Sequence, residues 1–365
     1  MKFTVINNEN NITINKYVDE LVRYFINKGN QLSDNLNEIN FVLNITSIQN
    51  PKLFRRRSKS IIVITITADS NDYANLKAAC YSSLIKSLSN QFIYIYTGKS
   101  KPFFKCGQTF FTTPEAGFYY IQFDPQKLYE LISPIANSHF ATDNLVYDDL
   151  PKRYYSGSAV VEELKVYGKE MDKMGVLPAP FPLKEILGEF ELRHLYKIFG
   201  ITGASYGNLS AREVIPELGE NTFWMTGRGI DKSNISEIGK DVLLVKDFNF
   251  NSGTAIISSP KNFNKKARVS VDAVEHSLIY KTFPEVKAIV HVHAWMENIL
   301  CTQQNYPCGT KELAEEVVSL LKKVPDKSSA TVGLKNHGLT ITGKSLKEIF
   351  DRIQGKLITE VKMVA

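Results

Sequence analysis

Cysteine and histidine are both scarce in this sequence, with four cysteines and six histidines among 365 residues. Cys80, Cys106, Cys301 and Cys308 have no dense spacing, which argues against the disulfide framework of a small secreted protein. The six residues between Cys301 and Cys308 also fit no common metal-ligand spacing. The sequence therefore predicts reduced thiols and a cytoplasmic protein.

Long apolar runs are absent as well. No stretch reaches membrane-spanning length, and the start "MKFTVINNENN" lacks the apolar core of a signal peptide. The net charge of +6 is dispersed apart from "RRRSK" at Arg55 to Lys59, where a solvated loop or strand edge is favoured over a phosphate contact. With 43% hydrophobic and 22% charged residues, the composition is that of an ordinary globular protein without a membrane or nucleic-acid partner.

The length favours two domains over one core. In residues 1–150, runs rich in β-branched and aromatic residues alternate with apolar residues at helical spacing, which predicts an α/β sandwich domain. This part contains no glycine-rich phosphate loop, no metal-type cluster and no catalytic signature, so its role is not predicted. The expected strands cover 39–47, 60–69, 91–98 and 117–124, and the expected helices cover 71–89 and 125–138.

A linker is expected at 147–158, followed by a second domain over 155–365. A helix over 159–175 ends at the prolines near residue 178, and an amphipathic helix over 183–200 ends at Gly200. Several strands follow, among them 286–295 and a single strand over 330–343. The last helices are expected over 310–323 and 345–361.

"AIVHVHAW", residues 288–295, places two of the six histidines in an apolar run that is typical of a buried strand. His291 and His293 project from the same face of such a strand, with Cα atoms roughly 6.6 Å apart, so both rings can reach one metal ion. The alternative is two core histidines, each with one hydrogen-bond partner. That alternative costs the desolvation of two polar rings with no compensation visible in the sequence.

"GLKNHGLTITG" contributes a third histidine, His337, followed by Gly338, where another backbone can approach closely. Taken alone, His337 is more typical of a turn residue. Together with the first pair, three neutral imidazoles and one open position describe a catalytic zinc site rather than a structural one.

Two carboxylates precede these histidines in "SVDAVEHSLIY". If this segment is helical, Asp272, Glu275 and His276 lie on neighbouring positions of one face. A carboxylate beside a Lewis-acidic metal can take a proton from a bound hydroxyl or an adjacent carbon. Alternatively, acidic residues in a first turn complement the helix dipole. His276 is expected to be structural.

In order along the chain, "GNLSAR", "MTGRGID", "VDAVEHSLIY", "IVHVHAW", "CGTKELAEEV" and "NHGLTITG" resemble the class II aldolase/adducin family over about residues 180–365. The resemblance implies a three-layer α/β/α domain that assembles as a homotetramer. Family members include zinc-dependent sugar-phosphate aldolases, ribulose-phosphate 4-epimerases and related dehydratases, and also adducin, which lacks such activity.

The resemblance also implies roles for single residues. His291, His293 and His337 match the three zinc ligands, and Asp272, nineteen residues before His291, matches the catalytic carboxylate, with Glu275 as the next candidate. The residues that match positions binding the substrate phosphate are Asn208, Thr226, Arg228, Gly229 and Ser270.

The expected function is that of a zinc-dependent lyase acting on a small hydroxy-carbonyl compound, a sugar phosphate, through a metal-stabilised enediolate. Zn²⁺ is the expected cofactor, although three histidines also accept other divalent transition metals. About fifteen residues separate His293 from "CGTKEL", where the aldolases have a longer segment with a proton-donating tyrosine. Epimerase, dehydratase and non-enzymatic adducin-like functions therefore remain alternatives.

Overall fold

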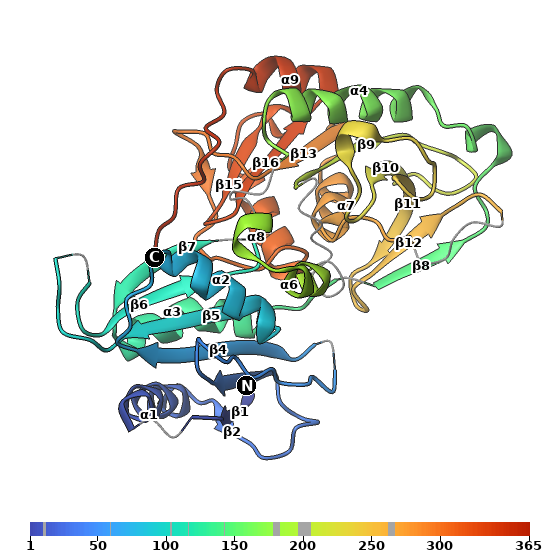
Figure 1. Ribbon diagram of the computed structural model, residues 1–365. Helices are drawn as coiled ribbons and strands as arrows, with labels where there is room; N and C mark the ends of the chain where they lie inside the picture. Colours follow the sequence, from blue (N-terminus) through green and yellow to red (C-terminus); the bar gives the residue numbers. More distant parts are fainter. Residues whose placement is uncertain are drawn as a thin grey trace. The chain divides into compact units, whose positions relative to one another are not determined.

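The computed structural model describes residues 1–9, 12–58, 60–102, 104–115, 117–141, 143–177, 183–195, 206–261 and 267–365. The chain forms two compact units (Figure 1). The first comprises Met1–Ser138, Pro182–Phe199 and Met363–Ala365, and the second comprises His139–Phe181 and Gly200–Lys362. No helix in the described ranges is long and apolar enough to cross a membrane.

The boundary between the units differs from the expected one at 150–155. β8 (Asp143–Tyr147) pairs in parallel with β12 (Thr254–Ser258), so it belongs to the sheet of the second unit. The pairing is long-range in sequence, and a short strand with alternating exposure gives no local sign of its partner. The N-terminal segment of the first unit therefore ends at Ser138, and the expected linker contains the end of β8 and the short helix η1 (Lys152–Tyr154).

The described residues of the first unit form a seven-stranded sheet in the order β2-β1-β3-β4-β5-β6-β7. Neighbours from β2 to β5 are parallel, whereas β6 and β7 join antiparallel. β3 and β5 are buried throughout, which explains their continuous apolar and aromatic sequences. The strands are β1 (Lys2–Asn7), β2 (Gln31–Leu32), β3 (Phe41–Ile45), β4 (Ile62–Asp69), β5 (Gln91–Tyr96), β6 (Gln108–Thr112) and β7 (Phe118–Gln122).

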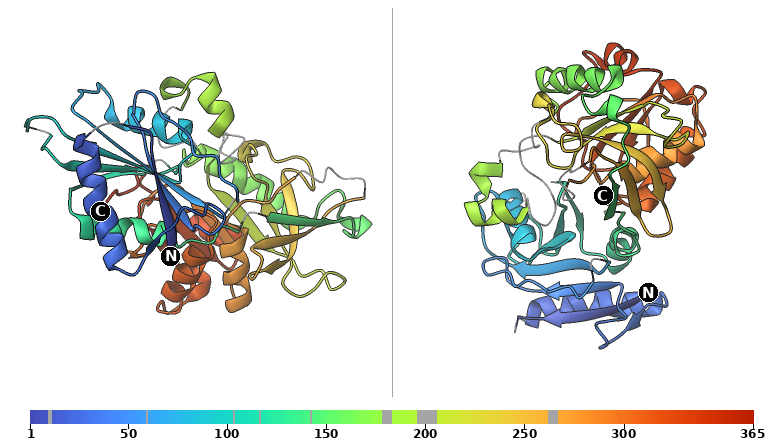
Figure 2. Two further views of the ribbon diagram at one scale, coloured as in Figure 1. Left: turned by 90° about the horizontal axis from the view of Figure 1, so that it is seen from below. Right: turned by 90° about the vertical axis from the view of Figure 1, so that its right-hand side faces the viewer.

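Three helices complete most of this unit: α1 (Ile12–Asn27), α2 (Leu76–Lys86) and α3 (Pro125–Ala136). The β1–α1–β2 and β4–α2–β5 connections run in opposite directions along the sheet, so right-handed crossovers place α1 and α2 on opposite faces (Figure 2). α1 contacts α3. The expected α/β layering of this unit is confirmed, while β1, β2, β6 and α1 were not anticipated.

The described residues of the second unit form a nine-stranded, largely antiparallel sheet in the order β14-β15-β16-β13-β9-β10-β11-β12-β8. Besides β8 and β12, its strands are β9 (Asn208–Arg212), β10 (Phe223–Thr226), β11 (Val242–Asn249), β13 (Ala288–Val292), β14 (Leu300–Cys301), β15 (Thr331–Leu334) and β16 (Gly338–Gly343).

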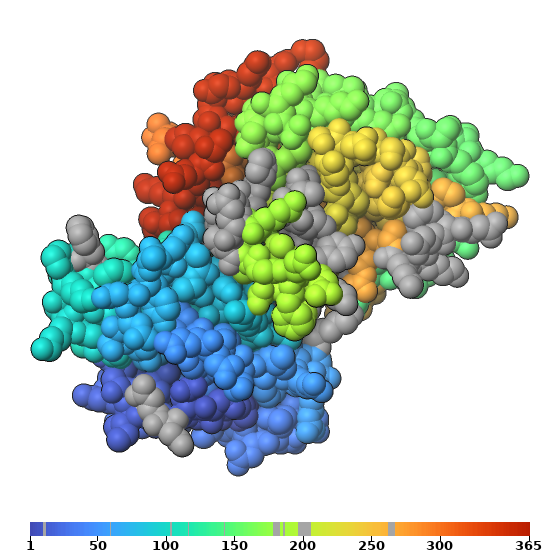
Figure 3. Space-filling model, viewed as in Figure 1, coloured from blue at the N-terminus to red at the C-terminus, as the bar shows by residue number. Residues whose placement is uncertain are grey.

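Helices cover both faces of this sheet. β10 shows the alternation: Phe223 and Met225 lie in a core with α7 (Ala273–Thr282) and α8 (Lys311–Leu321), whereas Trp224 lies in a second core with α4 (Ala159–Lys173) and α9 (Leu346–Ile353). α4 and α9 lie side by side on the surface of the unit (Figure 3), where the rings of Tyr167 and Phe350 stack at 4.7 Å. The expected three-layer α/β/α architecture is therefore confirmed.

Three expected elements differ in detail. The helix over 183–200 is divided into α5 (Leu183–Ile186) and α6 (Glu189–His194), because Gly188 has an extended backbone before α6; Gly200 and the prolines after residue 177 lie outside the described residues. α9 ends at Ile353, since Gly355 has a positive φ of 71°. The single strand expected over 330–343 is a hairpin, with β15 and β16 joined by a tight turn.

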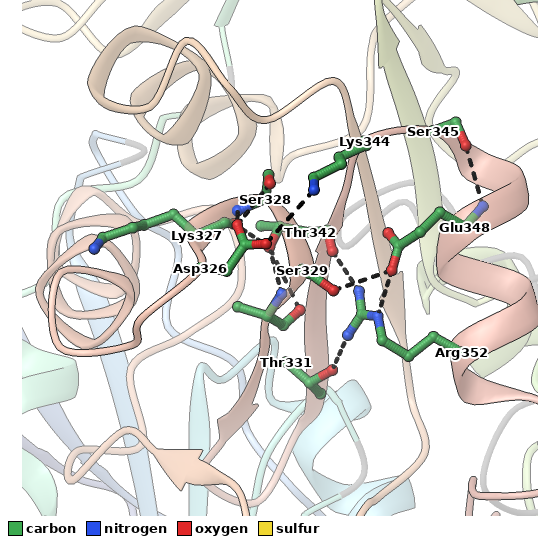
Figure 4. A network of polar contacts seen from close by, with 11 residues as sticks. Asp326, Lys327, Ser328, Ser329, Thr331, Thr342, Lys344, Ser345, Glu348 and Arg352 are labelled. Carbon is green, nitrogen blue, oxygen red and sulfur yellow. Dashed lines mark hydrogen bonds and ion pairs between the residues drawn. The ribbon is translucent and has the colours of Figure 1, made fainter.

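A polar network fastens that hairpin to α9 (Figure 4). The guanidinium of Arg352 donates to the carbonyl of Thr342 at 2.5 Å, to the hydroxyl of Thr331 at 3.1 Å and to Glu348 at 2.9 Å. Ser345 caps α9 by accepting from the backbone nitrogen of Glu348. Both strands of the hairpin are thus attached to one helix.

Candidate metal centre

Three adjacent strands form the floor of the candidate site. In the register of the sheet, His291 on β13 lies opposite Asn208 on β9 and opposite Thr340 on β16. All three residues are buried. A row of buried polar side chains thus crosses three neighbouring strands, and α7 lies on the same side.

The three expected histidines come together at one end of this row. His293 directly follows β13, and His337 lies in the turn between β15 and β16, next to Asn336 with a φ of 58°. Ring centroids are 5.1 Å apart for His291 and His293, and 4.8 Å apart for each pair that includes His337. Their ligand atoms all lie within 4.8 Å of one another. A hairpin turn and a strand separated by more than forty residues therefore meet in one cluster.

The ring nitrogens of this cluster fit a metal ion. The Nδ1 atom of His291 lies 3.0 Å from the carbonyl of Leu339, which orients the ring and leaves Nε2 toward the cluster. Within the described residues, His291 Nε2, His293 Nδ1 and both nitrogens of His337 are buried without a hydrogen-bond partner. Buried polar atoms are rarely left unsatisfied, so a ligand that accepts imidazole lone pairs explains them.

Electrostatics keep these rings in the ligand form. Burial lowers the pKa of His291 and His293, and burial together with the neighbouring His291 lowers the pKa of His337 to about 3. Neutral imidazole at neutral pH is the protonation state that metal binding requires.

Two glycines allow the backbones around the cluster to approach. A Cβ atom on Gly338 would lie 2.1 Å from the carbonyl oxygen of Val292, and one on Gly207 would lie 2.3 Å from that of His291. The close approach expected at Gly338 is thus present. It brings the turn that carries His337 directly against β13.

The first turn of α7 points three side chains at the floor, as expected for Asp272, Glu275 and His276. Asp272 Oδ2 accepts from the amide of Asn208 at 2.6 Å, and Glu275 Oε1 accepts from the hydroxyl of Thr340 at 2.6 Å. His276 Nδ1 lies 2.7 Å from the hydroxyl of Ser210. The N-terminal turn of the helix is therefore attached to strands on both sides of His291.

The two carboxyl groups have opposite pKa shifts. For Asp272, burial acts to raise the pKa, but the facing histidines and the thiol of Cys308 outweigh it, and the pKa is lowered. For Glu275, burial and the charge of Asp272 raise the pKa to about 8. The Asp272 carboxyl is therefore ionised at neutral pH, whereas that of Glu275 is protonated. Two neighbouring carboxyl groups with pKa values shifted apart are an arrangement that acid–base catalysis can use.

The expected phosphate-binding residues lie in two adjoining segments. The backbone nitrogen of Ser270 donates to the carbonyl of Thr226 at 3.2 Å, and that of Arg228 donates to the carbonyl of Arg268 at 2.7 Å. Gly229 has a positive φ of 68°, which shapes the turn. Burial and the nearby Arg268 lower the pKa of Arg228. Arg228 thus lies in one segment, and Arg268 and Ser270 lie in a second segment that is hydrogen-bonded to it.

Two of these residues have side chains engaged elsewhere. The hydroxyl of Thr226 accepts from the backbone nitrogen of Leu209 at 3.2 Å, and the amide of Asn208 donates to Asp272. The contacts of Asn208, Thr226, Arg228, Gly229 and Ser270 with a substrate phosphate stay predictions.

Two residues near the site were missed by the sequence analysis. Cys308 donates its thiol to Asp272 Oδ1 at 2.8 Å. Lys232 is buried, with 3% of the residue exposed, and this burial, opposed by Asp231 and Asp272, lowers its pKa to about 8. Cys308 opens the motif "CGTKELAEEV" and Lys232 directly follows "MTGRGID", but neither motif indicates which residue these side chains approach, because both reach the site through tertiary contacts.

Part of the chain is similar to known proteins. Residues 191–305 match the family described as Class II Aldolase and Adducin N-terminal domain. Methylthioribulose-1-phosphate dehydratase of Leptospira interrogans serogroup Icterohaemorrhagiae serovar copenhageni is 32% identical over 125 residues, which are 34% of this chain and 47% of that protein. The same enzyme of serovar Lai is 31% identical over the same share. The match thus spans about half the length of these curated relatives.

Among solved structures, L-fuculose 1-phosphate aldolase is 19% identical with a TM-score of 0.37, covering 55% of this chain and 82% of that one. YgbL of Klebsiella pneumoniae is 18% identical with a TM-score of 0.34, covering 53% and 83%. The resemblance to the class II aldolase/adducin family is therefore confirmed on the sequence match at residues 191–305.

Proposed function

We propose, from the family match at residues 191–305, that this protein is a divalent-metal-dependent lyase acting on a small phosphorylated hydroxy-carbonyl compound. The observation that carries the proposal is the cluster of three neutral histidines with unsatisfied buried nitrogens beside an ionised Asp272. We propose Zn²⁺ as the metal, since three imidazoles with an open position are typical of catalytic zinc.

His291, His293 and His337 would hold the ion, which when bound supplies Lewis-acid polarisation of a carbonyl oxygen. Asp272 would take a proton from the carbon next to that carbonyl, because its carboxylate is ionised and held by Asn208. Glu275, neutral at pH 7, would supply a proton nearby. Arg228 and Ser270 would bind the phosphate, the guanidinium through paired hydrogen bonds.

Within this lyase class, dehydration is the candidate reaction that we place beside aldol cleavage and epimerisation on a specific observation. That observation is the 32% identity over 125 residues to a methylthioribulose-1-phosphate dehydratase. In such a reaction Asp272 removes the proton next to the carbonyl, and the hydroxyl on the following carbon leaves as water. The organic product keeps its phosphate and gains a second carbonyl after the enol rearranges.

The test has a metal part and a substrate part. Metal analysis of the purified protein should find about one zinc per chain, and His291→Ala should lose it while His139→Ala, an exposed histidine, keeps it. Zinc-loaded protein is then incubated with methylthioribulose 1-phosphate, fuculose 1-phosphate and ribulose 5-phosphate, and products are identified by mass spectrometry. Asp272→Asn should lower turnover by about 10²–10⁴-fold.

Zinc content near zero in both the native protein and His291→Ala would contradict the proposal and favour an adducin-like binding module.

Family members often assemble as oligomers, and we propose a homotetramer in the cytoplasm. Light scattering of the zinc-loaded protein measures the assembly, and a monomer at micromolar concentration would contradict it.

A further inference from the structure

Cys308 lies in the segment "YPCGT", residues 306–310, which leads into α8. Thr310 caps this helix: its hydroxyl accepts from the backbone nitrogen of Leu313 at 3.4 Å and donates to the carbonyl of Pro307 at 2.7 Å. The hydroxyl thus ties the residue before Cys308 to the start of α8, which fixes the local path of the chain.

The same segment is packed against the residue that precedes Asp272. Gly309 has a positive φ of 72°, and a Cβ atom there would lie 2.7 Å from the Cβ of Val271. The carbonyl of Gly309 also accepts from the backbone nitrogen of Ala141 at 2.9 Å. Only a residue without a side chain lets the segment approach this closely, and the approach places the side chain of Cys308 beside Asp272.

The carboxylate of Asp272 is held at both oxygens. Cys308 Sγ lies 2.8 Å from Oδ1, and the amide nitrogen of Asn208 lies 2.6 Å from Oδ2. Asp272 is 5% exposed, so solvent contributes little to its orientation. A single donor would leave the carboxylate free to rotate about that contact, whereas two donors from different segments fix its plane.

We propose that Cys308 is a positioning residue of the enzyme, whose thiol, together with Asn208, fixes the plane of the Asp272 carboxylate for proton transfer. The inference rests on the proposed function for its catalytic part. A thiol is a weak hydrogen-bond donor, so it orients the carboxylate while withdrawing less of its basicity than a hydroxyl or an amide. Each carboxylate oxygen has more than one lone pair, so a donor can fix the position of the base and still leave a lone pair for the incoming proton.

The contact itself can be tested without any substrate. The negative charge of Asp272 disfavours the thiolate of Cys308, and the thiolate is the form that reacts with iodoacetamide. In full-length Asp272→Asn, alkylation of Cys308 should be severalfold faster than in the native protein, because the neighbouring negative charge is gone. Cys301 in the same sample is the internal control and should react at an unchanged rate. Equal rates for Cys308 in the two proteins would overturn the proposal.

The role in catalysis is tested with a matched set of variants. Cys308→Ala should lower kcat about tenfold with KM and zinc content unchanged, because a mispositioned base affects proton transfer and not binding. Cys308→Ser restores a donor and should recover most of kcat, and Cys301→Ser should match the native protein. Equal losses in Cys308→Ala and Cys308→Ser, or a change in KM alone, would overturn the positioning role. If no protein shows turnover, including the native one, the proposed function is refuted. The alkylation rates would still decide whether Cys308 contacts Asp272.

Discussion

His337 shows how much a single residue contributes to the candidate site. Its ring is buried in the turn between β15 and β16, 4.8 Å from each of the other two histidine rings, and both of its nitrogens lack a hydrogen-bond partner within the described structure. Such a ring costs desolvation unless a ligand takes up one nitrogen. A bound metal ion, as we propose, would offset that cost.

We expect His337→Ala to weaken zinc binding by more than about 100-fold, because even the loss of an outer partner of a ligand costs roughly 10–100-fold. Calorimetric titration with zinc measures the affinity. His139→Ala, whose side chain is 81% exposed, is the control and should bind zinc normally. Similar affinities for His337→Ala and the native protein would show that the ion is bound elsewhere.

Glu275 gives a prediction for pH dependence. Burial and Asp272 raise its pKa to about 8, whereas an unfolded glutamate has a pKa of about 4.3. Between these values the folded state holds a proton that the unfolded state has lost, so this residue makes the protein less stable as the pH rises through that window. In Glu275→Gln, the side-chain amide oxygen can still accept the hydrogen bond from Thr340, but the side chain no longer titrates.

The variant should therefore gain stability relative to the native protein as the pH rises from about 5 to about 8. Urea unfolding of both metal-free proteins at the two pH values measures the difference in free energy. A difference that is the same at both values would contradict a raised pKa for Glu275.

Among the elements, the hairpin of β15 and β16 has the most direct effect on the site, because its turn carries His337 and its second strand carries Thr340. Arg352 on α9 holds both strands, through Thr342 on one and Thr331 on the other (Figure 4). The position of His337 thus depends on a helix that contributes no residue to the metal cluster.

We expect Arg352→Ala to lower the free energy of unfolding by about 2–3 kcal/mol, since it leaves partly buried acceptors unpaired. Lys347→Ala on the same helix removes only an exposed pair with Asp351 and should change it by less than about 0.5 kcal/mol. Chemical denaturation of the two variants provides the comparison. A loss as small in Arg352→Ala as in Lys347→Ala would show that the network does not fasten the hairpin.

For the whole molecule, the division into two units has a thermodynamic consequence. All described residues of the metal cluster and of α7 lie in the second unit, so zinc should stabilise that unit directly. At a free zinc concentration of 100 times Kd the expected gain is about 2.7 kcal/mol.

Hydrogen exchange followed by mass spectrometry locates this gain. Added zinc should slow exchange in β9, β13 and β16 and leave β3, β4 and β5 of the first unit unchanged. Equal slowing in both sheets would show that the two units unfold together.

Local patterns in the sequence determined much of the fold and of the candidate metal site. The buried strand that carries His291 follows from its continuous apolar sequence, and the general α/β layering follows from runs rich in β-branched residues that alternate with apolar residues at helical spacing. These are short-range properties of the sequence. The motifs around them identified the family because they keep their order along the chain. The three histidines could be proposed as one cluster, because a catalytic zinc site needs three protein ligands and "AIVHVHAW" supplies only two.

The tertiary structure alone decided the rest. The boundary at Ser138 depends on β8 pairing with a strand more than a hundred residues away, and the hairpin around His337 depends on packing against β13. Cys308 reaches Asp272 across 36 positions of sequence, through a glycine that contacts Val271. Such contacts depend on how distant segments pack, and no periodicity or spacing within one segment encodes them.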